Sequence, residues 1–128
     1  YLVPLYPAES NHLLDIETLR QPEMRFFAAH RGAEVLAIGG CWLHGDYAEV
    51  KRIYVAPAAR GLGLAKLMMQ RIEAEAMACG HLLARLETGI HQPESLGLYR
   101  RLGYVDRGAF GDYPTDDPNS VFMEKMLG

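Results

Sequence analysis

The sequence predicts an α+β fold, in which a mixed and mostly antiparallel sheet carries helices on both faces. Three β-rich segments come first, across residues 25–55, and short polar turns separate them, as in an antiparallel meander. From residue 64 on, apolar positions recur at three- and four-residue steps, and helical and extended segments then alternate to the end of the chain. With 128 residues and 49% hydrophobic content, residues 1–128 are expected to form one domain with its own core.

The order of the elements follows from these patterns and from the breakers between them. Residues 9–21 hold a few Leu and Ile residues among polar ones, which predicts a short helix or two turns. One helix is predicted from Leu64 to the stop at Gly80, and another from Glu94 to the stop at Gly103. The predicted strands cover residues 25–30, 35–43, 49–55, 82–87 and 121–127.

Charge and composition narrow the class of partner. The formal net charge is −3 and 23% of residues are charged, so neither nucleic acid nor a membrane surface is an expected partner. No apolar run approaches the roughly 18 residues that a membrane-spanning helix needs. Cys41 and Cys79 are isolated in apolar surroundings and are predicted to be free, buried thiols, which fits a cytoplasmic location. The five histidines lack metal-ligand spacing, so no metal is expected.

The join between the third strand and the first predicted helix has the features of an anion site. Pro57 ends the strand, and Gly61 and Gly63 then let a ligand approach the backbone closely. The first N–H groups of a helix lack internal partners and carry partial positive charge, which suits phosphate or pyrophosphate. Arg60 adds a fixed positive charge. Glycines that serve helix packing alone are the alternative interpretation.

Two named phosphate-binding motifs do not fit this turn. A P-loop needs Gly-Lys-Ser/Thr at the helix start, whereas Gly63 is followed by Leu64, Ala65 and Lys66. The dinucleotide fingerprint needs a third glycine that this turn lacks, although Glu87 does end the next predicted strand.

The segment Arg60-x-x-Gly63-x-Ala65, preceded by the strand from Glu49 to Pro57, resembles motif A of the GNAT superfamily of acyl-CoA-dependent N-acyltransferases. The resemblance implies that the strand, the turn and the helix hold coenzyme A. Its pyrophosphate would bind Arg60 and the backbone N–H groups of Gly61, Leu62, Gly63, Leu64 and Ala65. Its pantetheine arm would face Ile53, Tyr54 and Val55.

The N-terminal part departs from the family's pattern. Domains of this family usually begin with a strand and two helices, and no strand is predicted before residue 25. The chain also begins at Tyr1 and not at Met. We therefore expect that the first strand and other upstream residues are missing, and a targeting segment among them stays open.

A second segment resembles motif B of the family. It runs from His91 through Ser95 and Tyr99 to Tyr104, and the resemblance implies that the Tyr99 phenol protonates the coenzyme sulfur as a general acid. Gln92 stands where many members have Asn and is expected to contact pantetheine with an amide one carbon longer. On spacing alone, Tyr99 also fits a core aromatic of an amphipathic helix.

Carboxylates supply the candidate base. In several family members a Glu on the motif A strand accepts the amine proton, which implies this role for Glu49. A strand-end Glu that faces solvent or Arg52 is the alternative. Glu87, at the end of the next strand, is expected to line the acceptor side and to share or replace the role, because two close carboxylates raise one pKa.

The C-terminal segment resembles the ending of a bacterial GNAT subgroup, with Phe-x-Asp-Tyr at 110–113 and Asp-Pro-Asn-Ser-Val-Phe-Met at 117–123. The same resemblance covers Leu-Glu-Thr-Gly at 86–89. Tyr113 is expected to contact substrate, and the acidic loop at 108–118 would suit a cationic acceptor. A solvated, turn-forming loop is the alternative.

The resemblance thus implies transfer of an acetyl group from acetyl-CoA, as co-substrate, to a primary amine by direct attack in a ternary complex. The acceptor would be a small-molecule amine or a peptide amine, and the sequence leaves a homodimer open. A catalytically weak module that binds or senses coenzyme A is the first alternative. A purely structural domain whose glycine turn packs a helix is the second.

Overall fold

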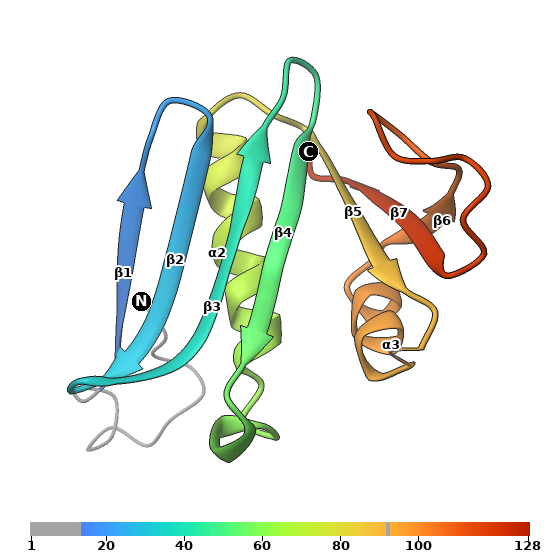
Figure 1. The fold of residues 1–128 in the computed structure, drawn as a ribbon. Helices are drawn as coiled ribbons and strands as arrows, with labels where there is room; N and C mark the ends of the chain where they lie inside the picture. Colours follow the sequence, from blue (N-terminus) through green and yellow to red (C-terminus); the bar gives the residue numbers. More distant parts are fainter. Residues whose placement is uncertain (1–13, 92) are drawn as a thin grey trace.

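The computed structural model describes residues 14–91 and 93–128, and their strands form one seven-stranded sheet in the order β1-β2-β3-β4-β5-β7-β6 (Figure 1). The strands are β1 Leu14–Arg20, β2 Met24–Arg31, β3 Glu34–Leu43, β4 Ala48–Val55, β5 Leu83–Gly89, β6 Val105–Arg107 and β7 Ser120–Met126. The helices are the short 3-10 turn η2 Pro57–Ala59, α2 Leu64–Ala78 and α3 Pro93–Arg101. This mixed and mostly antiparallel sheet with its helices confirms the predicted fold class, but both α-helices of the described residues lie on one face and not on both.

The prediction of a helix or turns across residues 9–21 is wrong for Leu14–Arg20, which forms strand β1. This strand pairs with β2 from Leu14 opposite Arg31 to Arg20 opposite Arg25, around a tight connection. A period-two alternation was present in Leu14, Ile16 and Thr18, but it is short, and the neighbouring strand decides the conformation. The expected place of the family's first strand lies upstream, outside the described residues.

Strands β4 and β5 are the one parallel pair of the sheet, and they separate soon after they meet. Their register covers only Ala48–Val50 opposite Ala84–Leu86, although β4 continues to Val55 and β5 to Gly89. The other neighbouring strands of the described sheet are antiparallel. A gap therefore opens between β4 and β5 in the middle of the sheet (Figure 1).

Strand β4 also contains a bulge at the point where it leaves β5. Ile38 of β3 pairs with Tyr54 and Gly40 pairs with Lys51, so Gly39 alone faces both Arg52 and Ile53. Arg52 takes a φ of 60°, and it is the only non-glycine with a positive φ among the described residues. Such bulges bend a strand and change the direction of its side chains.

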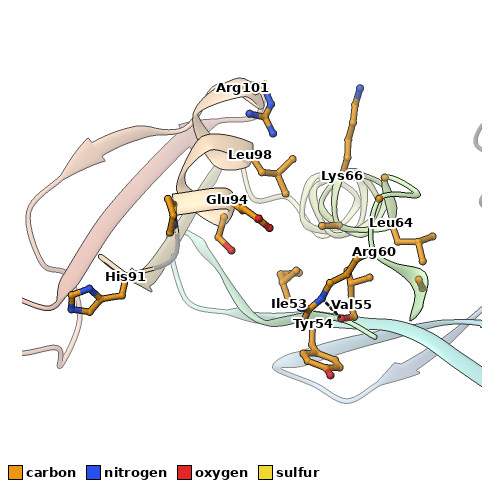
Figure 2. A pocket seen from close by; sticks show the side chains of 16 residues that line it. Ile53, Tyr54, Val55, Arg60, Leu64, Lys66, His91, Glu94, Leu98 and Arg101 are labelled. Atoms are coloured by element: carbon orange, nitrogen blue, oxygen red, sulfur yellow. Dashed lines mark hydrogen bonds between the residues drawn. The ribbon is translucent and has the colours of Figure 1, made fainter. Parts of the chain in front are cut away.

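The two faces of the sheet are covered differently. Figure 2 shows α2 and α3 on the same side of β4, and the main core lies under them, with Met68 of α2 and Tyr99 of α3 both buried. On β7, Met123 joins this core while its neighbour Phe122 points to the opposite face. There Phe122 packs with Tyr47 and with Phe110 of the loop at 108–118. That loop covers the second face of β5 and β7 in place of a helix.

Helix α2 is fixed to strands β1 and β2 by a buried carboxylate. Glu75 is 4% exposed and accepts contacts from Arg25 at 3.1 Å and from Arg20 and Arg71 at 3.4 Å each. The Cys79 thiol lies 3.8 Å from the same carboxylate. Cys41 is buried and Cys79 half-buried, and both are free thiols, which confirms the prediction of free cysteines. No helix of residues 14–128 is both long and apolar enough to cross a bilayer.

Replacing Glu75 by Ala should lower the free energy of unfolding by about 3 kcal/mol, because it leaves the Arg25 guanidinium half-buried without its counter-charge. Glu34→Ala is the matched control, since the Arg31–Glu34 pair is exposed and 3.9 Å long and should contribute less than about 1 kcal/mol. Urea denaturation of both variants measures the two losses. Equal losses would show that the Glu75 cluster does not hold α2 to the sheet.

Candidate active site

A cleft of about 600 Å³ opens at the start of α2, between β4 and α3 (Figure 2). The predicted coenzyme residues that line it are Ile53, Tyr54, Val55, Arg60, Gly61, Gly63, Leu64 and Ala65. The opposite wall comes from the segment before α3 and from the helix itself, with His91, Glu94, Ser95, Leu98 and Arg101. The structure thus brings the two segments that resemble motifs A and B to one cleft.

Backbone conformation explains the glycines of the turn. Gly61 and Gly63 take φ values of 86° and 74°, in a left-handed region that residues with a Cβ rarely adopt. Gly63 is the N-cap of α2, and the first helical bond runs from the Leu67 N–H to the Gly63 carbonyl at 3.2 Å. The N–H groups of Leu64 and Ala65 therefore precede the first helical bond and can donate to an anion in the cleft.

The basic residues of this cleft are partly those that the sequence predicted. Arg60 lines the cleft, but its Nε donates to the Val55 carbonyl at 3.3 Å, so the side chain folds back across the turn (Figure 2). Lys66 and Arg101 also line the cleft, on the side away from β4 (Figure 2). Sequence reasoning missed both. A basic residue in the first turn of a helix opposes the helix dipole, and this signal could have singled out Lys66.

One predicted coenzyme residue of the described part of the chain is not part of this wall. Leu62 is 42% exposed and does not line the cleft, because the turn directs it to the surface between the two glycines. Only its backbone N–H remains a candidate donor. Gln92 lies outside the described residues.

A second, smaller cavity of about 370 Å³ occupies the gap between β4 and β5. Its walls are Val50 to Ile53 of β4, Leu86 to Gly89 of β5, Ser95 and Tyr99 of α3, and Tyr113 of the loop. Ile53 and Ser95 line both cavities, so the two adjoin. The predicted residues Tyr99, Glu87 and Tyr113 therefore come together in this space.

Tyr99 is 8% exposed and packs edge-on against Tyr104, with ring centroids 6.0 Å apart. The ring therefore belongs to the core, as the alternative interpretation predicts, and the residue also lines the second cavity. Its role as a general acid stays a prediction. Burial raises the pKa of the Tyr99 phenol above its ordinary value. The phenol stays protonated at neutral pH and can act as a proton donor.

Glu49 is 3% exposed, which rules out the alternative of a strand-end carboxylate that faces solvent. One carboxylate oxygen accepts a hydrogen bond from the Tyr113 hydroxyl at 2.5 Å, and the other lies 3.0 Å from His44 Nε2. Lys51 Nζ is 3.7 Å away. Glu49 lines neither cavity, but Tyr113 and Lys51, which both contact it, line the second one, and the Tyr113 hydroxyl is the closer of the two.

Tyr113 and Glu87 face the second cavity directly. Burial, with help from the hydrogen bond to Glu49, raises the pKa of the Tyr113 phenol, so this hydroxyl also stays protonated at neutral pH. Glu87 accepts a hydrogen bond from the Ser120 hydroxyl at 2.7 Å, which holds the carboxylate at the cavity wall. The acceptor-side prediction for both residues is consistent with this placement.

The other acidic residues of the loop do not line either cavity. Asp112, Asp116 and Asp117 are exposed. Asp117 accepts from the Asn119 N–H at 2.9 Å and so forms a turn, as the alternative interpretation predicts. Among the described residues, no group of three or more His, Cys, Asp or Glu side chains could hold a metal ion.

Comparison with known proteins decides the family. The profile described as "Acetyltransferase (GNAT) family" matches residues 1–104. The chain belongs to the GNAT family of acetyltransferases. It is 49% identical to an "IAA acetyltransferase" of Azospirillum brasilense, over 99% of this chain and 84% of that protein.

Solved structures show the same GNAT fold. A Klebsiella pneumoniae protein assigned as an acyl-CoA N-acyltransferase superposes with a TM-score of 0.80 at 37% identity, over 92% of this chain and 82% of that one. The PaiA N-acetyltransferase of Thermoplasma acidophilum, solved in complex with coenzyme A, gives a TM-score of 0.71 at 18% identity, over 81% of this chain and 61% of that one. Members of the GNAT family use acetyl-CoA or coenzyme A.

A carboxylate placed at the start of α2 should weaken coenzyme A binding without weakening the fold. Ala65 lines the larger cleft, and Ala65→Asp would repel a diphosphate there while it interacts favourably with the helix dipole. Calorimetry should show at least about a tenfold loss of coenzyme A affinity, with an unchanged or higher Tm. Ala65→Asn, of the same shape but neutral, should lose less. Equal affinities for the two variants would place the diphosphate elsewhere.

Proposed function

We propose that this GNAT N-acetyltransferase moves an acetyl group from acetyl-CoA to a primary amine by direct attack in a ternary complex. The proposal rests on two adjoining cavities, which share Ile53 and Ser95 in their walls. The larger one has a glycine turn suited to an anion, and the smaller one has Tyr99, the carboxylate of Glu87, and Tyr113, whose hydroxyl donates to Glu49. A donor in the first and an acceptor in the second would meet in the gap between β4 and β5.

The residues of the larger cleft fit the phosphate end of coenzyme A. The Gly61–Gly63 turn leaves the backbone open to a bulky anion, since a Cβ at Gly61 would meet no atom within 4 Å. Lys66 and Arg101 have no hydrogen-bond or ion-pair partner within the described part of the chain, and both line the cleft. Acetyl-CoA would supply the acetyl group as a thioester, and Ile53 to Val55 would guide its arm toward Tyr99.

Tyr99 would act as the general acid. The carbon–sulfur bond of the thioester breaks as the amine attacks the carbonyl carbon, and the departing sulfur needs a proton. Tyr99 lines the gap at the end of the expected path of the arm, and burial keeps its phenol protonated. Its hydroxyl proton would pass to the sulfur.

Glu49 would act as the general base through Tyr113. An alkylammonium has a pKa near 10.4 and must lose a proton before it can attack. Tyr113 would accept that proton at its oxygen while its own hydroxyl proton moves across the 2.5 Å hydrogen bond to Glu49. His44, 3.0 Å from the other oxygen of Glu49, is half-buried and offers a further step toward solvent. The phenol is neutral before and after, so the carboxylate takes the charge.

Neither cysteine supports a covalent acyl-enzyme route. Cys41 is fully buried, and burial raises the pKa of its thiol to about 11. Cys79 lies beside Glu75 at the far end of α2, and neither thiol lines a cavity.

The second candidate function is a catalytically weak module that senses coenzyme A, and the separation of Glu49 from the cavity favours it. Acetyl-CoA-dependent turnover decides between the two.

Tyr99→Phe should lower kcat with a good amine acceptor on the order of 10²-fold, because the departing sulfur loses its proton donor. The dissociation constant of acetyl-CoA should stay within about twofold, since the phenol contributes mainly to the chemical step. Steady-state kinetics and calorimetry measure the two quantities.

The control for this variant is Tyr104→Phe. The Tyr104 ring packs on Tyr99, and its hydroxyl donates to Glu73 at 2.8 Å, away from both cavities. This change should lower Tm and leave kcat of the folded enzyme nearly intact. A loss of kcat in Tyr104→Phe as large as in Tyr99→Phe would mean that packing, not proton donation, explains the effect.

Tyr113→Phe should lower kcat/KM at neutral pH on the order of tenfold and move the acidic limb of its pH profile upward. Without the relay, only amine that is already neutral can attack, so activity should keep rising toward the amine pKa near 10.4. Tyr47→Phe is the control, because Tyr47 belongs to the same aromatic cluster and makes no hydrogen bond to Glu49. A pH profile that matches the wild type would exclude the relay.

A further inference from the structure

The smaller cavity carries charges of both signs. Glu87 lines it from β5, and Lys51 and Arg52 line it from β4. Lys51 is already engaged, because its Nζ lies 3.7 Å from Glu49 and 5.3 Å above the Trp42 ring. Arg52 is therefore the cation of this cavity that a ligand can use.

Arg52 stands out among the basic residues of the chain. All 13 Lys and Arg residues fall within the described residues, and ten of them make a hydrogen bond or an ion pair there. The three without such a partner in that part of the chain are Arg52, Lys66 and Arg101. Each of the three lines one of the two cavities. Lys66 and Arg101 line the coenzyme cleft, and Arg52 lines the smaller cavity alone.

The bulge in β4 places Arg52 at this wall. Val50 faces the core under the helices, so a regular alternation would send residue 52 to the same core. The extra residue shifts the alternation by one, and Ile53 enters instead, where its Cδ1 would meet a Cβ on Gly39. Arg52 keeps a left-handed backbone, with φ of 60°, and stays exposed at the cavity. A strained backbone at a cavity wall is characteristic of a functional position.

Resting on the proposed function, we propose that the acceptor is a small amino acid-like molecule, which carries a carboxylate in addition to its primary amine. Arg52 binds the carboxylate, for which the planar guanidinium offers paired donors. Glu87 and Tyr113 receive the amine on the β5 side of the cavity, next to the relay to Glu49. A ligand with both charges neutralises Arg52 and Glu87 together, which neither a simple amine nor a simple acid does.

The volume of the cavity supports a small acceptor. About 370 Å³ holds a molecule of amino-acid size. A free amino acid has its carboxylate close to its amine, so one molecule can reach both walls of the gap. The terminal amine of a peptide is followed by an amide instead, and it would leave Arg52 without a partner. The cavity therefore favours a free amino acid over a peptide.

The test compares amino acids with the amines that lack their carboxylate, such as phenylalanine with phenethylamine and lysine with cadaverine. The wild-type enzyme should prefer the amino acid of at least one pair. Arg52→Gln should lower kcat/KM for that amino acid on the order of 10²-fold and change that of its amine partner less than about threefold. Arg52→Asn serves as the second variant, because Asn tolerates the left-handed backbone and should keep the fold intact.

Two further measurements separate this inference from its alternatives. Coenzyme A affinity should be unchanged in Arg52→Gln, whereas Lys66→Gln should weaken it and raise KM for acetyl-CoA with every acceptor. Arg52→Glu should shift the preference from lysine toward cadaverine, since a second anion then faces the cavity.

Failure of the inference and failure of the proposed function give different results. If Arg52→Gln weakens coenzyme A and lowers turnover of both members of a pair equally, Arg52 belongs to the coenzyme and the inference is overturned, while the acetyltransferase stands. If the wild type turns over amines but no amino acid, the inference is again wrong. If nothing is turned over, calorimetry of the coenzyme A-saturated protein with an amino acid still tests whether Arg52 forms a binding site. Amino acid binding that Arg52→Gln abolishes supports the site, and no binding overturns it.

Discussion

The separation of β4 and β5 is the constraint on which the rest of the site depends. The two strands pair for only three residues each and then diverge, so backbone groups and side chains that a continuous sheet would cover become available to ligands. The same gap joins the two faces of the sheet. A donor held on the helix side and an acceptor held on the loop side can therefore meet at a point that neither face alone provides.

The two sides of this gap are formed by different kinds of structure, helices on one side and an irregular loop on the other. On one side, helices α2 and α3 pack on the main buried core, to which Tyr99 of α3 belongs. On the other side, the loop at 108–118 is fixed by edge-to-face contacts of Phe110 with Tyr47, Tyr113 and Phe122, at centroid distances of 5.4–5.6 Å. This aromatic cluster positions the Tyr113 hydroxyl against Glu49 without any regular secondary structure.

The distribution of charge in the domain separates structural roles from binding roles. Most basic side chains serve the fold, as Arg25 does with Glu75 and Arg85 with Glu124. Burial makes the Glu75 carboxylate costly to remove. The basic residues without a partner in the described part of the chain gather at the two cavities instead. A protein that leaves a guanidinium without a counter-charge beside a cavity leaves it available to a ligand.

Sequence by itself determined the central and C-terminal strands, helices α2 and α3, the glycine turn and the family, because each rests on local periodicity, on breakers such as Pro57, or on a short motif. It could not determine that Leu14–Arg20 is a strand, because pairing with β2 outweighs a weak local preference. Only the tertiary structure decided that Tyr113 stands between Glu49 and the cavity, and that a bulge brings Arg52 to the same wall. These relations join segments up to 64 residues apart, and no local pattern of side chains encodes a contact across a sheet.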